Sequence, residues 1–89
     1  MESSLPGSAE FVSSSRVRLK LLFQLVTGPK SPSELASIER KHVSHVSRAL
    51  AEMRSRGLVE YLATDSREHY YRVTSQGYAV FTILTRVAK

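Results

Sequence analysis

The 89-residue sequence has no cysteine, no tryptophan and no long apolar run. Without cysteine it can form no disulfide, thiolate metal site or cysteine nucleophile, which fits a reducing cytoplasm. No apolar stretch approaches the roughly 20 residues of a transmembrane helix. The opening MESSLPGSAEFV lacks the basic and apolar regions of a signal peptide. We therefore expect one small cytoplasmic domain.

Acidic residues are also few, eight against 13 lysines and arginines, and the formal net charge is +5. The two acids of the N-terminal segment, Glu2 and Glu10, precede the first base, Arg16, so the basic excess belongs to the rest of the chain. A compact basic body favours a polyanionic partner, either nucleic acid or an anionic membrane surface. Charge alone does not choose between these partners.

Residues 1–12, rich in serine and containing proline and glycine, are expected to form a flexible arm, and residues 13–89 one folded domain. Within that domain apolar residues first recur at helical spacing as far as Val26. Ser13–Ser15 can cap this first helix, and Gly28-Pro29 ends it.

The segment SPSELASI, residues 31–38, predicts the start of a second, short helix. Ser31 is a good N-cap, proline follows it at the first helical position, and Glu34 completes a capping box. A third helix is expected over about 41–56, ending at Gly57, a residue favoured just after helix ends.

Two runs rich in strand-forming residues follow, LVEYL (58–62) and HYYRV (69–73), joined by the polar ATDSRE. Thr74 then caps a last helix to about Ala88. A short capped helix, a turn and a longer helix form a helix-turn-helix, and a hairpin after it is a wing. The predicted fold is therefore mainly α with a small β-hairpin, a winged helix-turn-helix in the order α-α-α-β-β-α.

The third helix has two distinct faces. At 100° per residue, one stripe is apolar and is expected to be core: Val43, Val46, Leu50 and Met53, with Ala49 at its edge. The opposite face carries only bases, imidazole and hydroxyls in its first two turns, and Glu52 comes later. An ordinary solvated helix face mixes acids with bases, so this pattern favours a helix that enters the major groove of DNA. The candidates for base contacts are Lys41, Ser44, His45 and Arg48.

Four segments carry a resemblance to a known family: SELA (33–36), VSRAL (46–50), EMRSRGLVEYL (52–62) and YYRVTSQG (70–77). In this order and spacing they resemble archaeal and bacterial winged helix-turn-helix regulators of the MarR/ArsR-like kind, over about residues 16–78. The resemblance implies a double-stranded DNA-binding transcriptional regulator. The chain departs from the family pattern in SIERKH, since such proteins often have glycine near Arg40 and an apolar residue near Lys41. Ile38 is expected to supply the missing core contact.

Further DNA contacts are expected around this helix. Arg72 should face away from the core side of its strand, where it could reach phosphate. Arg67 at the hairpin tip either contacts DNA or simply pairs with Asp65 or Glu68 in solvent. Protonation of His45 would add a positive charge near phosphate and make binding pH-dependent. The remaining candidates lie in the turns and at helix starts: Lys30, Ser33, Arg40 and Ser47.

The histidines do not predict a metal site. His42 and His45 are three residues apart, but no cysteine or nearby carboxylate accompanies them, and His69 lies on the wing. We expect His42 to pack or cap at the buried edge of the helix. Asp65, the sole aspartate, lies at the hairpin tip, and no nucleophile motif or phosphate loop occurs. No enzyme activity, metal, cofactor or small-molecule ligand is therefore expected.

The last helix is apolar over nearly half its circumference, wider than one core stripe requires. It either lies flat on its own domain or forms a homodimer, and we expect the homodimer, with no membrane partner. Such a dimer presents two recognition helices about 34–36 Å apart to a pseudo-palindromic site. The alternative function is a winged-helix module for protein–protein interaction. The expected dimer residues are Val80, Ile83, Leu84 and Val87.

Overall fold

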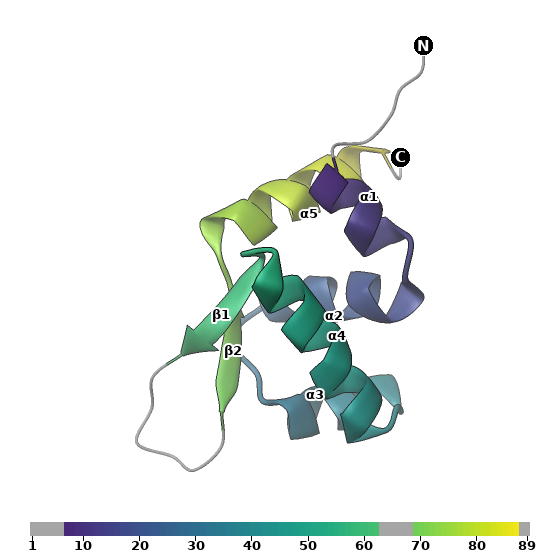
Figure 1. Ribbon diagram of the computed structural model, residues 1–89, viewed down its shortest axis with the longest axis vertical. Helices are drawn as coiled ribbons and strands as arrows, with labels where there is room; N and C mark the ends of the chain where they lie inside the picture. The colour runs from purple at the N-terminus through teal and green to yellow at the C-terminus, as the bar shows by residue number, and fades with distance from the viewer. Residues whose placement is uncertain (1–6, 63–68, 88–89) are drawn as a thin grey trace.

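The computed structural model describes residues 7–62 and 69–87. Within them lie five helices and one two-stranded sheet (Figure 1). In chain order these are α1 (Gly7–Ser13), α2 (Arg16–Val26), α3 (Pro32–Glu39), α4 (Val43–Ser55), β1 (Val59–Leu62), β2 (Tyr70–Val73) and α5 (Ser75–Val87). The predicted order of helices and strands is confirmed, with α1 added in front.

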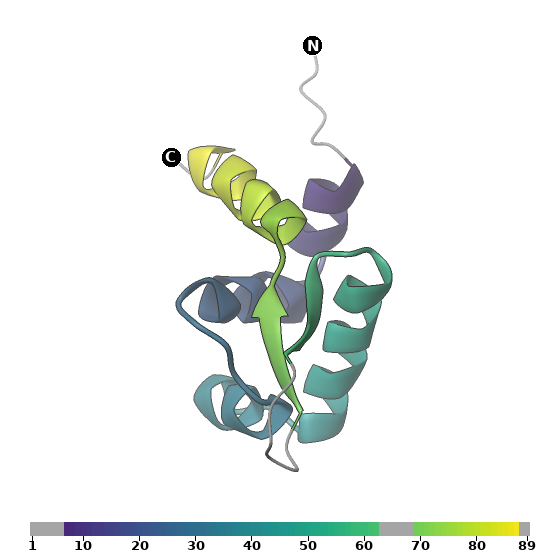
Figure 2. The same cartoon turned by 90° about the vertical axis from the view of Figure 1, so that its left-hand side faces the viewer.

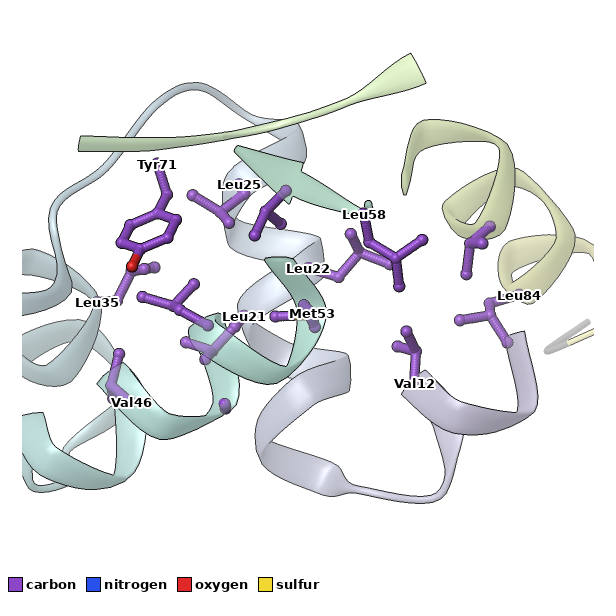
Figure 3. Packing of buried hydrophobic residues seen from close by; sticks show 14 of the residues in the cluster. Val12, Leu21, Leu22, Leu25, Leu35, Val46, Met53, Leu58, Tyr71 and Leu84 are labelled. Atoms are coloured by element: carbon purple, nitrogen blue, oxygen red, sulfur yellow. The ribbon is translucent and has the colours of Figure 1, made fainter. Parts of the chain in front are cut away.

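The flexible arm predicted for residues 1–12 is wrong from Gly7 onward, where α1 forms. Ala9 and Val12 are completely buried, and α1 packs against α2 and α5. Figure 3 shows Val12 facing Leu84 of α5. Helices this short are unstable alone and form through tertiary packing, so local composition did not reveal it. Residues 1–6 lie outside the described part.

The predicted caps of α2 and α3 are confirmed. The Ser15 hydroxyl accepts a hydrogen bond from the Arg18 amide at 3.2 Å. In α3 the Glu34 amide donates to the Ser31 hydroxyl at 3.1 Å, and the Ser31 amide donates to the Glu34 carboxylate at 3.0 Å. Ser31 is itself buried, whereas Glu34 is exposed, and this capping box fixes where α3 begins.

Two expectations about the turn between α3 and α4 are wrong. Arg40 adopts the left-handed conformation, with φ of 55°, and the Lys41 amide bonds to the Ala36 carbonyl. With the turn closed in this way Ile38 points outward, 48% exposed, and does not supply a core contact. Val43, in the first turn of α4, is also 48% exposed instead of buried. The buried stripe of α4 is Val46, Ala49, Leu50 and Met53.

The hairpin contacts the loop before α3 and the start of α5. β1 and β2 pair antiparallel, with Val59 opposite Val73, and Tyr71 exchanges two backbone hydrogen bonds with Lys30. The Thr74 hydroxyl accepts from the Gly77 amide at 3.0 Å, which confirms Thr74 as the cap of α5. Gly77 lies directly on the Leu58 carbonyl. These contacts join the start of α5 to the base of the wing.

One continuous core fills the domain (Figure 3). Its centre is α2, which contributes three fully buried leucines, Leu21, Leu22 and Leu25. Tyr71 points from β2 into the cluster, and Leu84 joins it from α5. No helix in the described residues is long and apolar enough to cross a bilayer.

The elements are distributed along the long axis of the molecule. In Figures 1 and 2, α3 and the start of α4 lie at one end, whereas α1 and α5 lie at the other. The helix-turn-helix therefore stands apart from the terminal helices, and each end offers its own surface.

Candidate nucleic-acid interface

The start of α4 presents an exposed surface without carboxylates. Because α4 buries the stripe that begins at Val46, the remaining positions of its first two turns face solvent. Among the described residues neither Lys41 nor Arg48 has a carboxylate partner. We call the exposed set the acid-free face: Lys41, Ser44, His45, Ser47 and Arg48.

The first acid of α4 is held away from this face. Glu52 accepts a hydrogen bond from the Arg18 guanidinium at 2.8 Å. Arg18 in turn lies over the Phe11 ring at 3.9 Å and donates to the Phe11 carbonyl at 3.0 Å. Since Glu52 is neutralised from α2, the positive charge at the start of α4 has no acid on the same helix to offset it.

Both histidines at the start of α4 are exposed. His42 occupies the N-cap position but makes no capping hydrogen bond through its side chain. Its expected packing or capping role is therefore wrong. The His42 and His45 rings lie edge to face, with centroids 6.0 Å apart. In the described parts of the chain no group of three histidine, aspartate or glutamate side chains gathers as a metal site would need.

The residues expected to flank α4 differ in availability. Ser33, at the start of α3, and Arg40, in the turn before α4, are exposed. Lys30 is not, because its ammonium group donates to the Gln24 carbonyl at 2.9 Å and to the Thr27 hydroxyl at 2.7 Å. Lys30 thus satisfies the end of α2, a stabilising place for a cation, and does not extend toward a ligand.

The wing contributes a paired arginine. Arg72 is exposed on the side opposite Tyr71, as predicted from strand alternation. Its guanidinium donates to the Glu60 carboxylate across the hairpin at 2.8 Å. This exposed pair is weak, so Arg72 can exchange it for another anion. Arg67 lies outside the described residues.

A cation–aromatic stack between α4 and the wing was missed from the sequence. The Arg54 guanidinium lies over the Tyr61 ring, 4.0 Å from its centroid, and the centroid of the His69 ring lies 5.4 Å from that of Tyr61. Burial raises the pKa of Tyr71 to about 12, and the neighbouring Tyr61 adds to the rise. These residues come from separate elements, and only the fold brings them together.

The α5 residues expected to form the dimer surface are largely buried within their own chain. Val80 and Leu84 are 5% and 6% exposed and belong to the core of their own chain. Ile83 is half-buried against that core, and the side chain of Val87 lies outside the described part. The exposed apolar side chains here are instead Phe23 and Tyr78, and both pack against the half-buried Phe81 ring, with centroids 5.0 and 5.7 Å from it. We call these three residues the aromatic band.

The sequence matches one family model. Residues 8–88 match the methanogenesis regulatory protein FilR1, N-terminal domain. No curated protein sequence matches the chain.

Solved structures share the whole fold. A protein from Enterococcus faecalis V583, described as a MarR-family transcriptional regulator, superposes with a TM-score of 0.80 at 24% identity, covering 90% of this chain and 76% of its own. HlyU from Vibrio cholerae gives 0.76 at 25% identity, covering 90% and 87%. A Mycobacterium bovis domain, described as a homodimeric winged helix-turn-helix DNA-binding domain, gives 0.74 at 23% identity, covering 91% and 74%. The predicted winged helix-turn-helix fold is confirmed.

Proposed function

The chain belongs to the family of the FilR1 N-terminal domain, part of a methanogenesis regulatory protein, and from this premise we propose that it is a transcriptional-regulator domain that binds double-stranded DNA in the cytoplasm. The observation that carries the proposal is the acid-free face of α4. Its exposed bases have no carboxylate partner in the described residues, and Glu52 is held by Arg18. A helix-turn-helix presents this surface to the major groove.

In the proposed complex α4 enters the groove by its N-terminal half. Ser44 and Ser47 are short and permit close approach to the base edges. Arg48 can donate two hydrogen bonds to guanine O6 and N7. Lys41, Arg40 and Ser33 then face the phosphate backbone. The two bases release counterions there and make the affinity depend on salt, and the Ser33 hydroxyl can donate a hydrogen bond.

The proposal is tested by fluorescence anisotropy with duplex DNA over a salt series, followed by selection of a preferred sequence. We expect a log–log slope of several units, near −0.9 per phosphate contacted. Arg48→Ala should weaken binding to the selected site by about 5- to 150-fold, since one bidentate base contact discriminates by about 1–3 kcal/mol. Its binding to random duplex should change far less.

Arg86→Ala is the matched control, because it removes one exposed arginine from α5 at the far end of the molecule. It should leave DNA binding unchanged. Weak binding with no salt dependence, down to low salt, would contradict DNA binding and favour the protein-interaction module.

We also propose that two copies act together. The Mycobacterium bovis neighbour is described as homodimeric, and the aromatic band provides an exposed apolar surface at the end away from α4. Phe23 and Tyr78 are 39% and 52% exposed and both pack against Phe81, so the exposed rings are contiguous, as at interaction surfaces. A dimer formed there leaves both copies of α4 free to contact successive turns of the major groove.

A further inference from the structure

A second basic feature lies where the start of α2 meets the turn between α3 and α4. A hollow of about 200 Å³ opens there, far larger than the ~10–15 Å³ that one water needs. Four cations line it, Arg16 and Lys20 from α2 and Arg40 and Lys41 from the turn. Glu39 is the carboxylate among its described lining residues. We call this site the basic hollow.

The carboxylate of the basic hollow is already engaged. One oxygen of Glu39 accepts from the Gln24 amide at 3.2 Å, and the other lies 3.9 Å from the Lys20 ammonium. The Glu39 side chain is only 13% exposed. Arg16, Arg40 and Lys41 therefore line the hollow without a carboxylate partner among the described residues, and their combined field attracts an anion.

Arg40 lines the hollow from a strained backbone position. It is the non-glycine residue with positive φ among those described, at 55°. Glycine adopts this conformation with less strain than any other residue. An arginine at this position places a guanidinium, with its fork of N–H donors, at the wall of a basic concavity. That geometry matches the oxygens of phosphate.

We propose that the basic hollow binds a phosphate group. The proposal rests on the proposed DNA binding for its principal source of phosphate, a backbone phosphate bordering the major groove. Lys41 of the turn and Val46 of α4 both line the hollow, and Lys41 also belongs to the acid-free face, where a DNA strand flanking an inserted helix would pass. A free phosphate anion offers the same chemistry and is the second source.

The test uses two variants of the hollow, Arg16→Ala and Arg40→Gly. Arg40→Gly relieves backbone strain, so its melting temperature should equal or exceed that of the wild type, and any loss of binding is not unfolding. Arg86→Ala removes the same charge outside the hollow. In one arm inorganic phosphate is titrated at constant ionic strength while backbone amide shifts are followed by NMR. In the other arm the salt slope of DNA binding is measured.

We expect each hollow variant to reduce the magnitude of the log–log salt slope by about one unit. Each should also weaken binding to the selected site and to random duplex by the same factor, whereas Arg48→Ala weakens mainly the former. A lowered slope identifies DNA phosphate as the ligand. Phosphate-induced shifts at Arg40 and Lys41, with unchanged slopes, identify a free anion. If the phosphate titration causes no shifts and the hollow variants leave the slope unchanged, the proposal is overturned. If the wild type binds no DNA, the proposed function fails, and the phosphate titration alone decides the hollow.

Discussion

At the scale of single residues, the contacts of three basic residues decide whether each one stabilises the fold or stays free to bind a ligand. Lys30 satisfies the end of α2 instead of reaching outward. Arg40 closes a turn where glycine is less strained. The Arg18 guanidinium neutralises the first acid of α4. Sequence patterns identified all three as basic residues, but only tertiary contacts separate those that hold the fold from those that remain available to a ligand.

Because the pKa of Tyr71 is raised, we expect the free energy of unfolding to fall at alkaline pH. Its pKa is raised from 10.0 to about 12 by burial, so the folded state binds the phenolic proton more tightly than the unfolded chain does. This contribution is fully present below pH 10 and is lost as the pH rises toward 12. Tyr71→Phe has no proton to lose and should flatten the profile in this window. Chemical denaturation at several alkaline pH values measures it, and an equally steep profile would contradict the assignment.

At the scale of elements, α5 is placed by close backbone contact with Leu58, the residue just before β1. A Cβ on Gly77 would overlap the Leu58 carbonyl and lie 2.7 Å from a methyl group of Val73. The Leu58 carbonyl belongs to the backbone, and Val73 is a β-branched residue with a stiff side chain, so neither group can move aside freely. Position 77 therefore has no room for a side chain.

Gly77→Ala should destabilise the domain by about 2–3 kcal/mol, because overpacking displaces α5 from the hairpin. Urea denaturation provides the measurement. Gly7→Ala is the control, since nothing lies within 4 Å of its added Cβ, and its effect should stay within about 0.5 kcal/mol. Equal stability of both variants would show that α5 adjusts without cost.

Elements with chemical start and stop signals were predictable. The capping box at Ser31 and the cap at Thr74 are local, so the sequence located α3 and α5 closely. α1 was not predictable, because its burial depends on α2 and α5. The exposure of Ile38 and Val43 also escaped prediction, since helical spacing indicates a face but not whether another element covers that face.

At the scale of the whole molecule, the two proposed functions lie at opposite ends of the long axis: DNA binding at the start of α4 and dimerisation at α5. Among the described residues, the end with the start of α4 carries bases that have no carboxylate partner, and α5, at the other end, carries part of the aromatic band. The exposure of the acid-free face was predicted because helical periodicity determines which side a core stripe leaves free. The basic hollow was not, because it combines α2, the turn and α4.

Tyr78→Glu should weaken homodimerisation at least several-fold, because it places a charge in the aromatic band on a side chain that is 52% exposed and so contributes little to folding. Light scattering after size-exclusion chromatography measures the oligomeric state. Ala79→Glu, exposed on the neighbouring side of α5, is the matched control and should remain dimeric. A wild type that is monomeric at high concentration would contradict the proposed dimer.

Arg18 has a consequence for the molecule as a whole. Its guanidinium donates to the Phe11 carbonyl, to the Ser14 hydroxyl at 3.1 Å and to Glu52 of α4. The end of α1 and the second half of α4 are therefore both hydrogen-bonded to one planar guanidinium group, that of Arg18. Neither helix can be displaced alone without breaking those hydrogen bonds. Through this one side chain, the position of α1 is linked to that of the helix proposed to enter the groove.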